Sequence, residues 1–438
     1  MSISCGVCYK KRRISNPIQP KPNNSNSQNY GFTEKNHNKF DENKNNKDND
    51  KTHGISYQNP KMDKTQNEKI KKIEEKNETP EKEDECVKGI IGLVNLGCCC
   101  YFNSAIQNLK NVYPFTLYFL KNYHNFNKSG FAYSYCKLIA NLIDQNKYQF
   151  FKPYEFFNQL QKIASNFRIG EQNDSSICII YILNNLEKET KKLGDPNPDI
   201  IESMNKEEKQ KFKFFIYKSF SKRNSYVLDY FYGFLQDIYQ CRNKKCKFTN
   251  YSFQGFSILN LPIVTIQNNN IFDLKEAFDY FQYGRLHKDE PNFNCSKCGG
   301  RDILSQSKII SYPKILIINF KRIGENYFYN HDLEVPSELC LDKYKFELIG
   351  FIKHIGGAKT GHNIAICKNF FDDKWYEYDD SKVIRLKDFN MIDKNKKPNT
   401  KNGFLFFYKK LNTFDNIETQ QDKNIIIQAS SDLRKYYN

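Results

Sequence analysis

The segment from residue 92 to residue 109 joins a glycine-containing turn to a helical pattern, and it constrains the fold more than any other part of the chain. The apolar positions of this pattern, at the spacing of one helix face, are Phe102, Ala105, Ile106 and Leu109. Cys100 stands where the helix begins, and the partial positive charge of a helix N-terminus stabilises a thiolate and lowers its pKa. Asn95, just upstream, brings an amide donor that suits an oxyanion. The segment therefore predicts a site for a nucleophile.

This segment resembles the cysteine box of the ubiquitin-specific proteases, a papain-like family of deubiquitinating enzymes. That box reads Gly-Leu-x-Asn-Leu-Gly before the nucleophile and Tyr-x-Asn-Ser after it, and both runs occur here. Cys98 and Cys99 stand where the family has Asn-Thr, and Cys100 alone directly precedes the Tyr-x-Asn-Ser run. The resemblance therefore implies that Cys100 is the nucleophile. The alternatives are a buried small-residue turn and a metal site, but adjacent cysteines lack the usual ligand spacing of zinc sites.

A cysteine nucleophile needs a base beside the thiol and a third group that orients the base. The segment 348–365 resembles the family's histidine box, in which His-x-Gly is followed by Gly-His and an apolar strand. This resemblance implies that His362 is the base and that His354 is the family's structural histidine. A lone histidine is more often a hydrogen-bonded core residue, but two motifs in the right order favour a functional role.

The next element, residues 375–383, resembles the family motif Trp-x-x-(Phe/Tyr)-(Asp/Asn)-Asp-x-x-Val. The match implies that Asp379 accepts the second imidazole N–H of His362, with Asp380 as a neighbour that assists. The order cysteine, histidine, aspartate also matches papain-type enzymes, in which the histidine lies far downstream of the cysteine. Cys100, His362 and Asp379 form the predicted catalytic triad.

Two cysteine pairs lie in polar turns between strand-like runs, Cys241 with Cys246 and Cys295 with Cys298. Four thiolates can hold a tetrahedral Zn²⁺ with no open position, which is the arrangement of a structural site. The pairs resemble the two zinc knuckles of the family's fingers subdomain, although the first pair has four intervening residues where the family has two. We therefore expect one structural zinc and no nucleotide or redox cofactor. The alternatives are free cysteines and a redox pair at Cys295 and Cys298, which lacks a thioredoxin-like context.

Residues 171–183 resemble the family box Gln-Gln-Asp-Ala-x-Glu-Phe-Leu. Asp174 aligns with the carboxylate that, in the family, helps to bind the ubiquitin C-terminal tail, and an aspartate here also suits a helix N-cap. Ile177 stands in place of the family glutamate, so one acceptor for a tail arginine is missing, and Asn363 replaces the tyrosine that lines the family's narrow glycine channel. The apolar run 177–183 is predicted as a core segment.

Composition divides the chain into three parts. Residues 1–85 are rich in Asn, Lys, Asp, Glu, Ser and Gln, and such a segment cannot bury enough surface to offset its ordering entropy, so we expect disorder. Residues 86–411 form the predicted catalytic domain, with fingers at about 236–312 and a charged surface insertion at about 188–224. Residues 412–438 show no sustained pattern and are predicted as a C-terminal tail.

Helical patterns come first in this domain and strand patterns follow. Helices are predicted at 100–110, 131–144, 153–164 and 174–187. Strands are predicted at 315–320, 346–352, 363–367 and 404–408. This order indicates an α+β architecture, and the family resemblance implies a papain-like fold with thumb, palm and fingers.

The net charge of +17 raises the question of anionic partners. The motifs that accompany nucleic-acid binding are absent, so scattered surface lysines are favoured. The sequence lacks a secretory h-region and any apolar run of membrane-spanning length, so we expect reduced thiols and a cytoplasmic or nuclear location. Cys5 and Cys8 beside the basic run 10–13 would permit an acylated membrane anchor or a localisation signal, although no function is the simplest interpretation.

The predicted function is therefore that of a monomeric thiol protease, which hydrolyses the bond after the C-terminal glycine of ubiquitin in ubiquitinated proteins. A catalytically weak ubiquitin-binding scaffold with the same fold is one alternative. A protease for a ubiquitin-like modifier is another, because Ile177 and Asn363 change positions that handle the substrate tail.

Overall fold

The computed structural model describes residues 87–143, 149–200, 204–262, 271–322, 332–357, 360–386, 402–411 and 419–435. The chain divides into two units, Met1–Asp84 and Glu85–Asn438, and every described residue lies in the second. The segment 1–85, predicted to be disordered, lies outside the described residues together with Cys5 and Cys8.

Helices form the first part of the described domain. They are α2 (Cys100–Asn111), α3 (Tyr113–Lys121), α4 (Phe131–Ile143), α5 (Tyr154–Ile163) and α6 (Ser175–Glu189), with a 3₁₀ turn at Tyr123–Asn125. The four predicted helices are confirmed, and α3 is an additional helix with Pro114 in its first turn, where a missing N–H costs little. The Asp174 carboxylate accepts the N–H of Ser176 at 2.6 Å, so the N-cap of α6 is confirmed.

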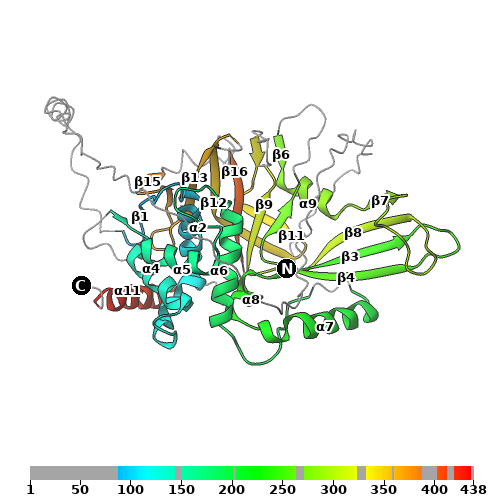
Figure 1. Ribbon diagram of the computed structural model, residues 1–438, viewed down its shortest axis with the longest axis horizontal. Coiled ribbons are helices and arrows are strands. Elements are labelled where there is room, and N and C mark those ends of the chain that lie inside the picture. The colour runs from blue at the N-terminus through cyan, green and yellow to red at the C-terminus, as the bar shows by residue number, and fades with distance from the viewer. Residues whose placement is uncertain are drawn as a thin grey trace, which may run out of the picture. The chain divides into compact units, whose positions relative to one another are not determined.

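A large mixed sheet follows the helices along the chain (Figure 1). Its strand order is β15-β14-β13-β12-β16-β9-β5, and β11 also pairs with β12. The strands are β5 (Leu259–Leu261), β9 (Ile315–Phe320), β11 (Glu338–Leu341), β12 (Tyr344–Gly356), β13 (Gly361–Lys368), β14 (Trp375–Asp379), β15 (Lys382–Leu386) and β16 (Gly403–Lys410). Neighbouring strands are antiparallel except β5 and β9. The four predicted strands and the α+β fold are confirmed.

The fingers are a separate antiparallel sheet with the order β4-β3-β8-β7, and Figure 1 shows it extending to the right, away from α2 to α6. Its strands are β3 (Gly233–Cys241), β4 (Thr249–Phe256), β7 (Arg285–Lys288) and β8 (Asp302–Ser311), and α9 (Leu274–Gln282) precedes β7. Two short parallel pairs complete the described strands: β1 (Gly92–Leu93) with β2 (Phe150–Phe151), and β6 (Ile271–Asp273) with β10 (Asp332–Glu334).

The charged segment 188–224, predicted as a surface insertion, contains a long amphipathic helix. This is α7 (Lys206–Phe220), followed by a 3₁₀ turn (Ser221–Arg223) and α8 (Tyr226–Phe231). Its buried residues are Phe212, Ile216 and Phe220, spaced four apart along one face. Phe212 packs edge-on against Phe234 of the fingers, with ring centroids 5.5 Å apart. The segment therefore has an apolar cluster of its own that supports the fingers.

The predicted C-terminal tail contains helix α11 (Gln420–Lys435). Its buried residues are Ile426, Ala429, Ser430 and Leu433. The helix packs against α3 and α4, and the Tyr113 hydroxyl donates to the Asp422 carboxylate at 2.9 Å. The folded domain thus extends beyond its predicted limit at residue 411.

Helix α2 is buried along its whole length, in contact with α3, α6 and strands β12 to β14. Its apolar face lies in the core shared by the helices, where Phe102, Ala105, Ile106 and Leu109 are fully buried. Because packing encloses the helix on all sides, its first residue is held in a fixed place beside β13.

Candidate active site and metal centre

The turn before α2 is shaped by left-handed backbone and by the Asn95 side chain. Gly97 has a φ of 111°, which only glycine adopts without strain, and Cys98 has a φ of 51°. The Oδ1 atom of Asn95 accepts the N–H groups of Gly97 and Cys99, both at 2.9 Å. Cys99 is buried and its thiol donates to the Gly97 carbonyl at 3.0 Å, whereas Cys98 is exposed. The turn therefore presents Cys100 as the first residue of α2.

Cys100 is the first residue of α2 and is only 6% exposed. Burial raises the pKa of its thiol, the N–H of Asn363 opposes this effect, and the Asp380 carboxylate adds to it. The N–H groups of Tyr101 and of Cys100 itself also lower the pKa, but the net direction is upward. The expectation of a lowered thiol pKa is therefore wrong for this arrangement, because burial outweighs the helix N-terminus.

His362 on β13 and Asp379 on β14 are in direct contact, with Nε2 of the imidazole 2.5 Å from Oδ1 of the carboxylate. Oδ2 of Asp380 lies 3.9 Å from the same nitrogen. Because Nε2 faces the carboxylates, Nδ1 is the nitrogen left for the thiol. Within the described residues the imidazole makes no hydrogen bond to Cys100, although the N–H of Asn363, the next residue along β13, points at the sulfur.

Asp380 occupies the two-residue turn between β14 and β15, with a φ of 51° that aspartate tolerates. Its carboxylate accepts hydrogen bonds from the amides of Asn95 (2.8 Å) and Asn103 (2.7 Å). Its backbone carbonyl accepts the N–H of Leu93 at 2.8 Å. The predicted neighbour of the acid is therefore the group that ties the turn before α2 to the sheet.

His354 and Asn363 belong to a buried polar chain on β12 and β13. The ring nitrogens of His354 lie 2.7 Å from Oδ1 of Asn363 and 3.0 Å from the Gly357 carbonyl. The Asn363 amide donates to the Ser175 hydroxyl at 3.0 Å, which lies 3.3 Å from that of Ser104. Asn363, which replaces a family tyrosine, thus points inward and links β13 to the starts of α6 and α2.

Polar side chains on α2 bind the extended segment that precedes it. Asn103, Gln107 and Lys110 all donate to backbone carbonyls within residues 89–93. These three side chains carry no predicted role, although Asn103 and Gln107 belong to the cysteine box and their spacing of four places them on one helix face. They fix the helix that carries Cys100 against the strand that leads into it.

The start of α6 borders the site. The Gln172 amide donates to the carbonyl of Gly361, the residue before His362, at 2.9 Å. Asp174 lies two residues further on, at the N-cap. Ile177 is 40% exposed and Tyr181 is 36% exposed, so the prediction of a core segment at 177–183 is wrong for these two residues.

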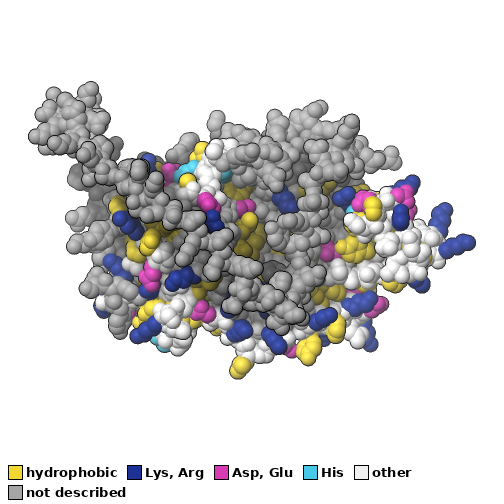
Figure 2. Space-filling view, viewed as in Figure 1, with side chains coloured by type: hydrophobic (Ala, Val, Ile, Leu, Met, Phe, Trp, Pro, Cys, Tyr) yellow, Lys and Arg dark blue, Asp and Glu magenta, His cyan; other side chains and the backbone are white. Residues whose placement is uncertain are grey.

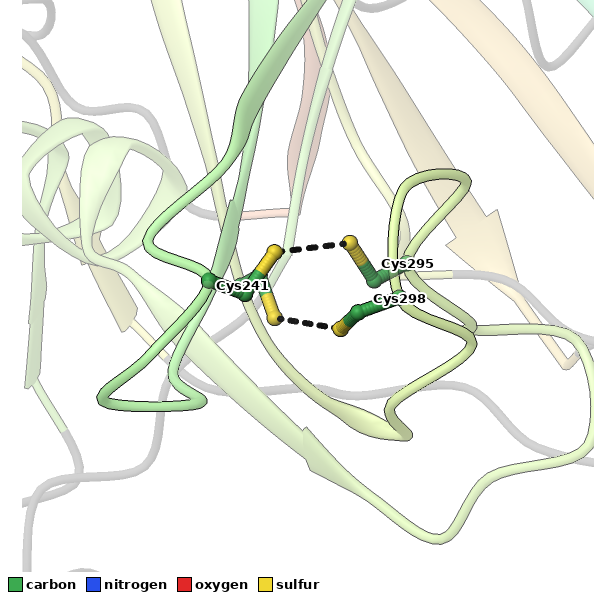
Figure 3. A group of neighbouring side chains, drawn as sticks. Cys241, Cys295 and Cys298 are labelled. Carbon is green, nitrogen blue, oxygen red and sulfur yellow. Dashed lines mark hydrogen bonds between the residues drawn. The ribbon is translucent and has the colours of Figure 1, made fainter.

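Four cysteines of the fingers converge on one point, and Figure 3 shows the three that it labels. Cys241 ends β3, Cys246 lies in the turn before β4, and Cys295 and Cys298 lie between β7 and β8. The sulfurs of Cys241 and Cys298 are 3.7 Å apart, as are those of Cys246 and Cys295, and all four lie within 4.8 Å of one another. Tetrahedral zinc with bonds of about 2.3 Å separates its sulfurs by about 3.8 Å. The donor set therefore fits such an ion.

The backbone around the second cysteine pair favours a thiolate. Burial alone would raise the pKa of Cys295, but the N–H groups of Cys298 and Lys297 and the neighbouring thiols lower it to about 7. The N–H of Gly299 donates to the Cys295 carbonyl, and the N–H of Cys295 donates to the Gly300 carbonyl, each at 2.8 Å. The N–H groups around Cys295 therefore favour its thiolate, the form in which a cysteine binds metal, whereas the pKa values of the Cys241 and Cys246 thiols are raised.

Cys100 on α2 lies beside the strands that carry His362 and Asp379, and known proteins share this arrangement. Residues 91–408 match the family model described as ubiquitin carboxyl-terminal hydrolase. The chain belongs to this family. The match spans the cysteine box, the four fingers cysteines and the strands that carry His362 and Asp379.

Curated members of the family resemble the chain at moderate identity. Ubiquitin carboxyl-terminal hydrolase 2 of Homo sapiens is 24% identical over 347 residues, which cover 74% of this chain and 55% of that protein. Ubiquitin carboxyl-terminal hydrolase 5 of Saccharomyces cerevisiae is 26% identical over 348 residues, which cover 67% of this chain and 42% of that protein. The chain thus spans about half the length of the curated relatives it matches.

Solved structures of the family share the fold. A chain of the SAGA DUB module with Ubp8, bound to monoubiquitin, matches with a TM-score of 0.56 at 19% identity and covers 79% of this chain and 74% of its own length. The module bound to ubiquitin aldehyde matches with the same TM-score at 20% identity, over 74% of this chain and 70% of that one. The predicted papain-like family fold is therefore confirmed.

The distribution of basic side chains is relevant to anionic partners, and the length of the apolar helices is relevant to membrane association. Figure 2 shows Lys and Arg side chains at many separate places on the described surface of one face. Within the described part of the chain, no helix combines the length and the apolar character needed to cross a bilayer.

Proposed function

We propose that this domain is a thiol-dependent deubiquitinase, which hydrolyses the isopeptide or peptide bond after the C-terminal glycine of ubiquitin. The observation that carries the proposal is the position of Cys100 at the start of α2, beside the strand on which His362 contacts Asp379. A nucleophile, a base and an orienting carboxylate are the parts that a cysteine protease needs. Membership of the ubiquitin carboxyl-terminal hydrolase family supports the choice of substrate.

The first step transfers the Cys100 proton to Nδ1 of His362. Burial raises the pKa of the thiol and no hydrogen bond joins it to the imidazole here, so substrate binding has to bring the two groups together, as in other apo sites. The thiolate then attacks the carbonyl carbon of the terminal glycine. The N–H of Cys100 and the Asn95 amide stabilise the oxyanion, because an amide nitrogen carries two hydrogens and Asp380 takes only one.

Collapse of the tetrahedral intermediate breaks the C–N bond and leaves a thioester on Cys100. The His362 imidazolium protonates the departing lysine amine, and the Asp379 carboxylate stabilises that imidazolium. His362 then takes a proton from water, which attacks the thioester carbonyl. The products are a free ubiquitin carboxylate and the restored thiol.

We further propose that the fingers cysteines hold one structural Zn²⁺. The ion would join the turn after β3 to the loop before β8, because each of those segments contributes two thiolates. Four protein ligands leave no position for substrate or water, so the ion would stabilise the fingers and take no part in the reaction.

Two specific observations favour other functions. The raised thiol pKa and the lack of a hydrogen bond between Cys100 and His362 favour a scaffold that binds ubiquitin with little turnover. The isoleucine at position 177, in place of an acidic residue, favours a ubiquitin-like modifier as the substrate.

An electrophile fused to the C-terminus of ubiquitin tests the proposal, with the adduct located by peptide mapping. We expect modification at Cys100 and complete loss of the adduct in Cys100→Ala. The matched controls Cys98→Ala and Cys99→Ala should keep most of it, because these thiols are exposed or bonded within the turn. An adduct on Cys98 or Cys99 would contradict the choice of nucleophile. Reaction only with a ubiquitin-like probe would select the modifier protease, and binding without an adduct would select the scaffold.

A further inference from the structure

A series of buried side-chain hydrogen bonds runs behind the proposed active site. Its members, each at most 8% exposed, are Ser104 on α2, Ser175 at the start of α6, Asn363 on β13 and His354 on β12. The Asn363 amide lies at the centre, because it donates to the Ser175 hydroxyl at 3.0 Å and its oxygen lies 2.7 Å from Nδ1 of His354. The hydroxyls of Ser175 and Ser104 are 3.3 Å apart. We refer to these four side chains as the buried polar chain.

The buried polar chain is attached to the backbone at both ends. At one end the Ser104 hydroxyl donates to the carbonyl of Tyr101, the residue after Cys100, at 3.1 Å. At the other end Nε2 of His354 lies 3.0 Å from the Gly357 carbonyl. The chain therefore joins the first turn of α2 to the segment that follows β12.

Strand pairing directs the backbone N–H of Asn363 towards the nucleophile. Asn363 pairs with His354 across β12 and β13, and the His354 N–H donates to the Asn402 carbonyl at 3.0 Å, on the far side of β12. The pair is therefore of the non-hydrogen-bonded kind, in which the N–H groups of both residues point away from each other. Since β14 pairs with β13 only from Ala365 onward, the Asn363 N–H faces α2, where it points at the Cys100 sulfur.

Asn363 thus reaches the start of α2 by two routes. Its N–H meets the Cys100 sulfur, and its side chain leads through the two serine hydroxyls to the carbonyl of the next residue of the same helix. This closed ring of hydrogen bonds fixes the separation of the N–H and the sulfur, because a shift of β13 along α2 would break a buried link. A hydrogen bond to a thiolate is stronger than one to a neutral thiol, so a fixed N–H favours the reactive form.

We propose that Asn363 is a positioning residue, whose side chain holds its own N–H on the Cys100 sulfur and so stabilises the attacking thiolate. This inference rests on the proposed protease function and adds a residue to its machinery. An amide suits the position, because it donates on one side and accepts on the other. The role would belong to this chain in particular, since Asn363 replaces the family tyrosine.

The test measures how the rate of Cys100 alkylation by iodoacetamide depends on pH, with the product located by peptide mapping. Every protein carries Cys98→Ala, because the exposed Cys98 thiol would compete. We expect Asn363→Leu and Ser175→Ala each to move the midpoint of the profile upward by about one pH unit, the effect of losing one hydrogen bond to a charged group. With a fluorogenic ubiquitin substrate, kcat should fall about tenfold with little change in KM.

A second serine and a control locate the effect in the buried polar chain. Ser104→Ala and Ser175→Ala remove the same link, so the double variant should move the midpoint no further than either single variant. Additive shifts would show that the two hydroxyls act separately and would overturn the ring. The matched control is Ser430→Ala on α11, whose buried hydroxyl donates to the Ile426 carbonyl at 2.7 Å, and it should leave the midpoint in place.

A purely structural role of Asn363 would lower the melting temperature without moving the midpoint, because the ionisable groups beside Cys100 are the same in every variant. These groups are Cys99, Tyr101, His362, Asp379 and Asp380. An unmoved midpoint in Ser175→Ala would therefore overturn the inference, even if Asn363→Leu fails to fold. A shift in Asn363→Leu alone would overturn it as well, because only that change removes the partner of His354.

The two readouts also separate this inference from the proposed activity. Alkylation of Cys100 requires no ubiquitin. If the unsubstituted chain is alkylated but cleaves no ubiquitin substrate, the proposed hydrolysis fails, while the midpoints still decide whether Asn363 positions its N–H on the sulfur.

Discussion

The side-chain amide of Asn95 donates to the carboxylate of Asp380 at 2.8 Å, across 285 positions of sequence. Asn103 donates to the other oxygen of the same carboxylate. Each oxygen of Asp380 therefore accepts a hydrogen bond from a residue that lies close to Cys100 in the chain. Asp379, one residue earlier, is therefore the acid available to His362. Two adjacent aspartates thus serve two different partners, one the turn before the nucleophile and the other the base.

Removal of the base should cost more than removal of the acid. We expect His362→Ala to lower kcat about 10⁶-fold and Asp379→Ala about 10⁴-fold, because the orienting group of a triad contributes less than the base. Asp380, 3.9 Å from the imidazole, supplies some orientation when Asp379 is missing. Steady-state cleavage of a fluorogenic ubiquitin substrate measures both. Near-normal rates for His362→Ala would move the base to another residue.

Asn95 should act on the transition state rather than on binding. We expect Asn95→Ala to lower kcat by about 10²–10³-fold with little change in KM, the effect of losing one oxyanion donor. The same change frees the N–H groups of Gly97 and Cys99, so folding must be measured alongside. The exchange Asn95→Asp with Asp380→Asn separates the two effects, because it restores the hydrogen bond in reverse without the oxyanion donor. Full recovery of kcat in the double variant would rule out the donor role.

Zinc should stabilise the fingers without taking part in the reaction. We expect about one tightly bound zinc per chain. Cys298→Ser should lower the melting temperature by roughly 4–7 °C, the shift that about 3–5 kcal/mol produces in a domain of this size. Cys340→Ser is a matched control, because Cys340 is exposed and outside the cluster. Metal analysis that finds no zinc in protein refolded with it would reject the site.

Lys110 should make stability depend on pH. Burial lowers its pKa from 10.5 to about 7, so between these values the unfolded chain binds more protons than the folded one. The free energy of unfolding should therefore rise across this window by about 1.4 kcal/mol per pH unit. Below pH 7 Lys110 is charged in both the folded and the unfolded chain, so the full cost of burying the charge is present there. Lys110→Met should remove this slope, because methionine does not titrate. The Gly89 carbonyl keeps a hydrogen-bond donor in this variant, since the Tyr378 hydroxyl still donates to it. Urea unfolding at several pH values measures the slope, with Lys209→Met, a change at an exposed lysine, as the control. Equal slopes for the unsubstituted chain and Lys110→Met would contradict the buried charge.

Helix α11 should be an integral part of the domain. Leu433 is 1% exposed, and we expect Leu433→Ala to cost about 2–5 kcal/mol of unfolding free energy, as large-to-small changes in a core do. Asn424→Ala, on the exposed side of the same helix, should cost much less. Equal losses from the two changes would show that the helix is held by its ends rather than by its buried face.

Local patterns carried most of what the sequence could predict. The helix at 100–111 and the strand at 315–320 have strong apolar periodicity over their whole length, so their positions are readable without knowledge of their partners. The cysteine pairs are readable for the same reason, because each knuckle places two ligands within a few residues.

Features that depend on distant contacts could not be predicted. Ile426, Ala429 and Leu433 of α11 stand at helical spacing, but the segment around them is mostly polar, and their burial depends on α3 and α4, which lie against them. The role of Asp380 depends on a left-handed turn that places it beside Asn95. An unbroken apolar run likewise cannot reveal which side of α6 faces solvent, so the exposure of Ile177 was missed.

Helix α11 also sets the timing of folding during synthesis. Its buried face completes a core formed with α3 and α4, and about 290 residues separate Ile143, at the end of α4, from Leu433 (433 − 143). At roughly 5–20 residues per second, a ribosome needs about 15 to 60 s to cover that interval. Throughout it, the nascent helices expose the apolar surface that α11 will occupy, so we expect chaperones that recognise such surfaces to bind the emerging chain.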